Sequence, residues 1–195
     1  MPKTLSTSQQ IAQLNRELAV AQICYEMYKN LTFTSSGISN NIETLYFRYP
    51  NLIKAERNIY FSTLIIQLYK LIDDHPKSIS LEKLIGMCNT NSSYTTIKTS
   101  YQQLISRYSK PIRLLRSKAC AHTDIYDEPD ELFNQIAPPI AYQDLNDALI
   151  ELKTIINFIN SCLNGGKINN PPIDFAVVGK EQKEIVQLIA NHLNK

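Results

Sequence analysis

The chain has 195 residues, 44% of them hydrophobic, which is enough for one domain with a substantial core but too few for two full domains. Its formal net charge is +2, and three of its five glycines follow residue 164, so the earlier part is well suited to long helices. The longest apolar stretch, residues 59–72, is interrupted by polar residues and is too short to cross a bilayer of about 30 Å. We therefore expect no membrane segment. Because the N-terminal residues lack the apolar core of a secretory signal, we expect a cytoplasmic protein.

The first predicted helix begins at a capping Thr7 or Ser8 and ends near Asn30, because apolar residues recur there at three- and four-residue steps. A second helix follows Pro50 and carries a similar apolar stripe. It should end before Pro76, since proline disfavours helical geometry in the residue that precedes it. Both helices are expected to bury their apolar stripes in one core.

Ser80 is expected to cap a short third helix, and residues 94–108 form another amphipathic one. Pro111 then stands where a new helix can begin. After an acidic loop, residues 142–163 form a long helix that the Gly-Gly pair at 165–166 ends. The expected fold is all-α, an antiparallel bundle of four to five main helices with short accessory helices.

The domain boundary is predicted at the end of that last long helix. Residues 1–164 form the helical bundle, and residues 165–195 form a C-terminal tail. This tail contains the Gly-Gly pair, a Pro-Pro linker and a terminal amphipathic helix.

The four cysteines indicate neither a metal site nor a disulfide framework. Cys24, Cys88, Cys120 and Cys162 are widely spaced, with no CxxC pair and no histidine at ligand spacing. Buried small side chains are the simplest interpretation. We expect no metal and no cofactor.

Charge is distributed unevenly along the chain. Between Glu82 and Asp124 there is no acidic residue, and seven basic residues lie in this interval: Lys83, Lys98, Arg107, Lys110, Arg113, Arg116 and Lys118. From Asp124 to Glu151 there is no Lys or Arg, and the acidic residues are Asp124, Asp127, Glu128, Asp130, Glu131, Asp144, Asp147 and Glu151. One interpretation is a solvated charged face, and the other is an anion site with an acidic rim. A basic stretch that ends in a histidine fits a phosphodiester partner such as RNA.

The segment RSKACAHTD, which begins at Arg116, holds the candidate chemistry. On one continuous helix Arg116 and His122 lie about 9 Å apart along the axis and about 120° apart around it. They converge on one phosphate if the helix loosens near Cys120, or if a second copy packs alongside. The second arrangement predicts a homodimer with the motif helix at its two-fold axis.

This segment resembles the R-x(4–6)-H signature of the HEPN family. The residues that carry the likeness are Arg116, Ser117, Lys118, Ala121, His122 and Asp124. Upstream, LYKLIDD and SISLEKLIG precede the motif helix by about 25 residues, in an order similar to the abortive-infection branch of that family. The likeness covers about residues 10–160. It implies a helical bundle that dimerises along the motif helices and acts as a metal-independent endoribonuclease, usually a toxin or a phage-defence effector.

By residue match, the resemblance assigns the catalytic roles to Arg116 and His122. The supporting or RNA-binding residues expected around them are Ser117, Lys118, Arg113, Lys110 and Asp124. Ser117 stands where the family more often has Asn, Asp or His. A subgroup carries a tyrosine at the position of Asp124, where a partner enzyme attaches AMP, so this mode of silencing is not expected here.

Cleavage of RNA through its own 2'-hydroxyl needs a base for that hydroxyl, a cation for the phosphorane and an acid for the leaving oxygen. His122 and Arg116 fit the first two roles, and the acid is either His122 after it has taken the proton or the same residue of a second copy. Nearby cations favour the neutral imidazole, whereas Asp124 favours the charged one.

Two alternatives to a catalytic site remain open from the sequence. The cluster of Arg, Lys and His side chains can simply stabilise the C-terminal end of a helix through its dipole. The departure at Ser117 is consistent with a catalytically inactive HEPN-like bundle that binds nucleic acid or protein. The partners expected are RNA, a second copy of the chain, and an antitoxin or another defence protein.

Overall fold

The computed structural model describes residues 5–32, 48–73, 79–121, 140–165 and Glu184. Within these residues there is no strand, and five helices follow one another: α1 (Thr7–Thr32), α3 (Pro50–Ile72), α4 (Leu81–Gly86), α5 (Tyr94–Ala121) and α7 (Tyr142–Asn164). The predicted all-α bundle is confirmed. The predicted tail lies outside the described residues, apart from Gly165 and Glu184, so the domain boundary stays a prediction.

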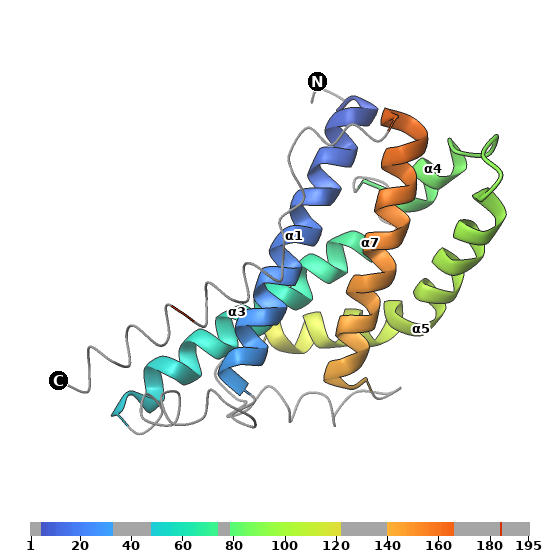
Figure 1. Cartoon of the computed structure of the whole chain (residues 1–195). Coiled ribbons are helices and arrows are strands. Elements are labelled where there is room, and N and C mark those ends of the chain that lie inside the picture. Colours follow the sequence, from blue (N-terminus) through green and yellow to red (C-terminus); the bar gives the residue numbers. More distant parts are fainter. Residues whose placement is uncertain (1–4, 33–47, 74–78, 122–139, 166–183, 185–195) are drawn as a thin grey trace.

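The helices pack around one hydrophobic core. α1 lies along α3 and also contacts α7, while α5 crosses the bundle and packs against both α3 and α7 (Figure 1). All five helices contribute side chains to the core, and examples that are fully buried are Leu14, Leu64, Leu84, Leu104, Leu115 and Ile156. Each such side chain stabilises the fold by about 1.5 to 3 kcal/mol relative to an exposed one. Burial of this kind fixes the position of α5, on which the candidate site lies.

Helix α1 confirms the predicted stripe and corrects its start. The buried residues are Ile11, Leu14, Leu18, Ala21, Cys24, Tyr25, Tyr28 and Leu31. The capping residue is Ser6 rather than Thr7 or Ser8. The backbone N–H of Gln9 donates to Ser6 Oγ over 3.3 Å, and the backbone N–H of Ser6 donates to Gln9 Oε1 over 2.9 Å. This reciprocal pair is a capping box, which satisfies two backbone donors at once.

Four other predicted helix ends agree with the structure, at both ends of α3, at the start of α4 and at the end of α7. Pro50 begins α3, and Asp73, which follows its last residue, has an extended backbone. Ser80 caps α4 by accepting a hydrogen bond from the backbone N–H of Lys83. Gly165 ends α7 with a φ of 59°, a left-handed conformation that glycine adopts without steric cost.

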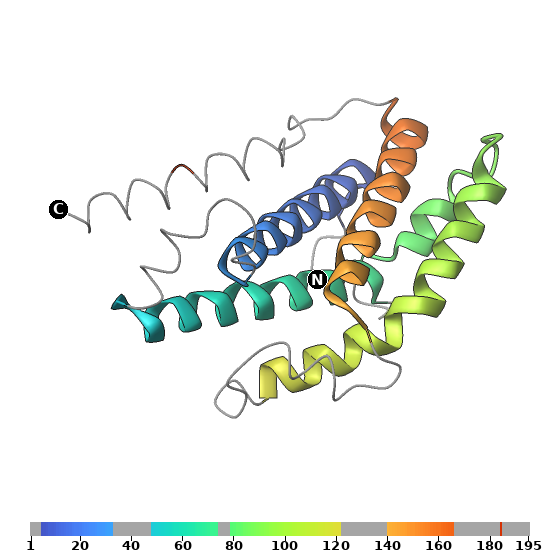
Figure 2. The ribbon, with the colours of Figure 1, turned by 60° about the horizontal axis from the view of Figure 1, so that its bottom comes forward.

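The structure differs from the sequence interpretation at Pro111, which was expected to begin a new helix. α5 instead runs for 28 residues with Pro111 inside it. Proline lacks the backbone N–H that would bond to the carbonyl of Arg107 and crowds that turn, which bends a helix. Both ribbon views show α5 changing direction partway along its length, and its later half passes toward α3 (Figures 1 and 2). The continuous helix is held by packing on both sides of the bend, since Leu104 and Leu115 are both fully buried.

Candidate functional site

Five of the seven predicted site residues lie on the described part of α5, namely Lys110, Arg113, Arg116, Ser117 and Lys118. His122 and Asp124 lie outside the described residues, so the predicted convergence of Arg116 with His122 stays a prediction. The side chain of Cys120 lies outside them as well.

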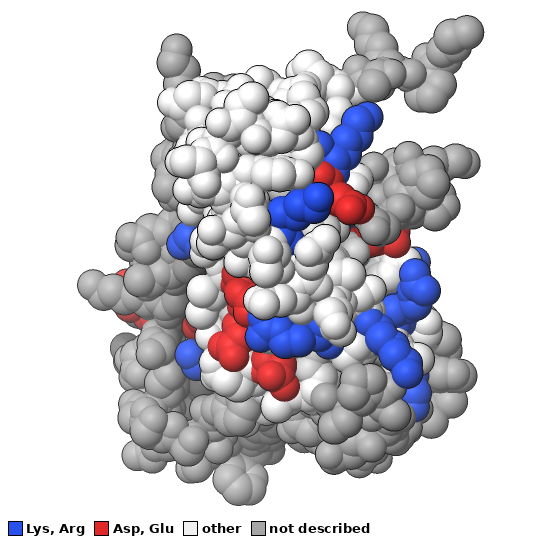
Figure 3. Space-filling model, turned by 90° about the vertical axis from the view of Figure 1, so that its right-hand side faces the viewer, with Lys and Arg blue, Asp and Glu red and all other residues white. Residues whose placement is uncertain are grey.

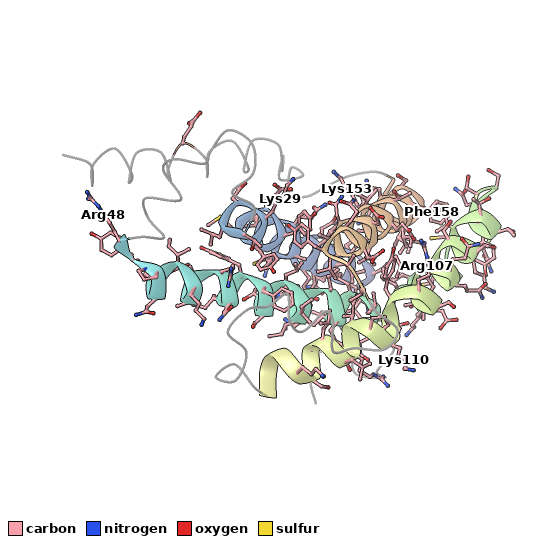
Figure 4. The ribbon with its side chains drawn as sticks, turned by 90° about the horizontal axis from the view of Figure 1, so that it is seen from below. Lys29, Arg48, Arg107, Lys110, Lys153 and Phe158 are labelled. Carbon is pink, nitrogen blue, oxygen red and sulfur yellow. The ribbon has the colours of Figure 1, made fainter. Side chains whose placement is uncertain are left out.

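The part of α5 from Lys110 onward, called here the basic half, has one apolar side and one basic side. Ile112 and Leu115 are fully buried against the core. Lys110, Arg113 and Ser117 are exposed and follow each other at steps of three and four residues, so they share one face. In Figure 4, Lys110 points away from the bundle. This half-helix therefore presents basic side chains to the solvent while its other side anchors it.

Arg116 contacts an aromatic ring of another helix. Its guanidinium carbon lies 4.2 Å from the centroid of the Tyr69 ring, which belongs to α3. At this distance the positive charge is attracted to the face of the ring. Arg116 is exposed, and among the described residues no carboxylate lies within ion-pair distance of it. The sequence shows no sign of the contact between Arg116 and Tyr69, because a contact between two helices distant in sequence leaves no local pattern.

Arg107, on the other half of α5, is engaged by a carboxylate. Its Nη2 donates to both oxygens of Glu151 on α7, over 2.5 and 2.7 Å. The hydrogen bond with Glu151 is the main cause that raises the pKa of the Arg107 guanidinium above its usual value. Figure 4 shows Arg107 directed toward α7. This arginine joins two helices and belongs to the fold rather than to an anion site.

The described acidic residues of the second charge block serve α7 and its packing. The backbone N–H of Ala141 donates to Asp144 Oδ2 over 2.6 Å at the start of the helix. Asp147 accepts a hydrogen bond from Gln143, and Glu151 pairs with Arg107. Each of these three residues therefore has a partner in the fold, and the acidic rim stays a prediction. The earlier members of the block, Asp124 to Glu131, lie outside the described residues.

The surface on the side of α5 shows basic side chains beside acidic ones in one area and basic side chains alone in another (Figure 3). At the lower left of the view, acidic side chains lie directly beside basic ones. At the lower right, basic side chains have no acidic atoms between them. Basic side chains that no described carboxylate pairs with attract polyanions.

Two of the described cysteines, Cys24 and Cys88, are buried thiols with little nucleophilic character. Cys24 and Cys88 are buried, as predicted, and Cys162 is half-buried. Burial raises the pKa of the Cys24 thiol to about 11. Burial, together with a hydrogen bond to Cys162, raises the pKa of Cys88 to about 12. Both thiols are therefore protonated at neutral pH, and the thiolate is the reactive form.

The described part of the chain contains neither a cluster of metal ligands nor a membrane-spanning helix. No group of three or more His, Cys, Asp or Glu side chains there is arranged to hold a metal ion. None of the helices described is both long and apolar enough to span a membrane.

Comparison with known proteins identifies a family. A family model named HEPN_AbiU2, with the description AbiU2, matches residues 7–189. No curated protein and no solved structure matches the chain at a significant level. The match covers all five described helices, including the whole of α5 with its basic half.

Proposed function

Because the chain belongs to the HEPN family, in its abortive-infection branch, we propose that it is a metal-independent endoribonuclease that acts as a toxin or phage-defence effector. The observation that supports this best is the basic half of α5, where Lys110, Arg113 and Arg116 are exposed. Among the described residues, none of the three is paired with a carboxylate. An RNA strand is the polyanion that such a surface and the motif helix suit.

The reaction is a transfer within the RNA strand. His122 removes the proton of a 2'-hydroxyl, and the 2'-oxygen attacks the adjacent phosphorus. Arg116 stabilises the negative charge of the phosphorane, which is the largest electrostatic requirement of this step. The 5'-oxygen leaves with a proton from a protonated imidazole, and the products are a 2',3'-cyclic phosphate and a 5'-hydroxyl.

The partner arrangement follows from helix geometry. Six residues of regular helix separate Arg116 from His122 by about 9 Å along the axis and about 120° around it, so one undistorted helix does not aim both at one phosphate. A second copy of the chain, packed along the same helix, supplies the missing group. The proposed partners are RNA, this second copy, and an antitoxin or defence protein that restrains the cleavage.

The test compares purified variants on RNA with a chelator present. Wild-type protein is expected to cut, and Arg116→Ala and His122→Ala are expected to be nearly inactive. Lys98→Ala is the matched control, because it removes one exposed positive charge from the other half of the same helix. Equal cleavage by wild type and His122→Ala, or cleavage only with added metal, contradicts the proposal.

A second candidate function is an inactive HEPN-like bundle that binds nucleic acid or another protein. Ser117 is exposed and stands where the family more often has Asn, Asp or His. Salt-sensitive RNA binding without cleavage supports this candidate if it is weakened by Lys110→Ala and Arg113→Ala but unchanged by His122→Ala.

A further inference from the structure

We propose that Tyr69 of α3 is a positioning residue for Arg116. The Arg116 guanidinium carbon lies over its ring, and no carboxylate of the described residues takes up the N–H groups, which can then bind a phosphate of the RNA. This inference deepens the proposed endoribonuclease function and rests on it. It concerns a residue outside the motif helix and therefore extends the site to a second helix.

The contact between Arg116 and Tyr69 differs from the other two cation–ring contacts among the described residues. The Lys98 ammonium lies 5.6 Å from the centroid of Tyr94, and the Arg107 guanidinium carbon lies 5.0 Å from that of Tyr108. Both are contacts within α5 between residues close in sequence. Arg116 lies closest to its ring, at 4.2 Å, and its partner belongs to another helix. The contact therefore fixes the guanidinium relative to the bundle and not only relative to its own helix.

Both members of the pair are anchored by their neighbours. Tyr69 is half-buried and packs against the core cluster, and the residue before it, Leu68, is fully buried. Leu115, next to Arg116, is also fully buried. The ring thus has a fixed place, and a long flexible arginine side chain gains a defined position before substrate arrives. Groups that are already in place at the developing charge give the largest electrostatic contribution to catalysis.

An aromatic partner suits this task better than a carboxylate. The five N–H donors of a guanidinium lie in its plane, so a ring over its face occupies none of them. Arg107 shows the contrast, because its Nη2 is bonded to Glu151. A carboxylate at Tyr69 would also repel the incoming phosphate, whereas the ring carries no charge.

The experiment measures kcat and KM for RNA cleavage by variants of Tyr69. Tyr69→Leu removes the ring face and is expected to lower kcat by about 3- to 10-fold, the equivalent of one cation–ring contact, with a smaller change in KM. Tyr69→Phe keeps the face and is expected to cut like wild type. Tyr60→Leu is the matched control, because Tyr60 is also a half-buried α3 tyrosine packed on the core. It is expected to change thermal stability and leave kcat unaltered.

Two further measurements separate positioning from stability. In an Arg116→Ala background, Tyr69→Leu is expected to cause no additional loss of kcat. The ring current of Tyr69 should shift the Nε–Hε signal of Arg116 in an NMR spectrum, and Tyr69→Leu should remove that shift. If Tyr69→Leu does not fold, as judged by circular dichroism, Tyr69→Met keeps the apolar bulk without a ring face and carries the same expectations.

The outcomes distinguish this inference from the proposed function. If wild type does not cleave RNA, or if Arg116→Ala cleaves normally, the proposed function is wrong and the role of Tyr69 falls with it. If Arg116→Ala is inactive while folded Tyr69→Leu keeps the kcat of wild type, only the role of Tyr69 is overturned. The same holds if Tyr69→Phe loses as much activity as Tyr69→Leu.

Discussion

Arg107 and Arg116 lie on the same helix, on either side of Pro111, and the bundle engages them in opposite ways. Arg107 donates two hydrogen bonds to Glu151 of α7, so its charge is neutralised within the protein. Arg116 lies over the ring of Tyr69 of α3, and no carboxylate of the described residues pairs with it. The comparison shows that a basic residue in a basic stretch is available to bind an anion only if no carboxylate of the protein already pairs with it.

The first prediction separates the two arginines by activity. Arg116→Ala is expected to lower kcat for RNA cleavage by about 100-fold or more, because loss of one group that stabilises the transition-state charge costs that much. The exposed position of Arg116 predicts little change in thermal stability. Arg107→Ala is expected to keep its kcat, since its Nη2 is bonded to Glu151. Equal losses of kcat in the two variants would remove the distinction between the halves of α5.

The second prediction tests the bend that separates the arginines. Pro111→Ala restores a backbone N–H and favours a straighter helix. Arg116 then moves relative to Tyr69, and a displacement of about 1 Å at a catalytic group is enough to lower rates by 10-fold or more. We expect kcat to fall about 10-fold while circular dichroism shows the same helix content. A wild-type kcat in this variant would show that the bend does not position Arg116.

The helices also show which features of the fold the sequence could predict. The apolar stripes of α1, α3 and α7 were predictable because helical periodicity is a local pattern that survives folding. Pro111 was interpreted wrongly as the start of a helix. Proline is unfavourable inside a helix on local grounds, and here buried residues on both sides of it hold the helix together. The cap at Ser6 was missed by one residue, the usual scale of uncertainty at a helix end.

The candidate site was also predictable only in part, because the sequence shows local patterns but not contacts between distant helices. The basic stretch and the motif placed Arg113 and Arg116 on one helix, because charge and spacing are properties of the local sequence. Lys110 joins them only because the helix continues through Pro111. The partners of the basic residues cannot be predicted from the local sequence. Glu151 and Tyr69 reach α5 from other helices, and their contacts depend on how those helices cross. The long-range pairing thus decides which basic residues are left without a carboxylate partner among the described residues.

The third prediction concerns the exposed charges next to Arg116. Lys110→Gln and Arg113→Gln are each expected to weaken RNA binding several-fold at low salt. Each substitution is also expected to reduce the slope of log K against log salt by about 0.7, the value for one phosphate contact on a single strand. Arg107→Gln serves as the comparison from the other half of α5 and should leave the slope unchanged. An unchanged slope in the Lys110 and Arg113 variants would place the RNA elsewhere on the bundle.

The fourth prediction, with the smallest expected effect, concerns the pair that neutralises Arg107. The side chains of Arg107 and Glu151 are 52% and 29% exposed, and ion pairs at such positions contribute about 0.2 to 1 kcal/mol. Glu151→Gln should therefore lower the free energy of unfolding in urea by less than about 1 kcal/mol, and added salt should shrink the difference. RNA binding is the more informative measurement. If Glu151→Gln leaves affinity unchanged, Arg107 is too distant from the RNA to join the site even when released. If affinity rises, the ion pair with Glu151 is what prevents Arg107 from binding RNA. The difference between Arg107 and Arg116 then comes from their partners and not from their positions on α5.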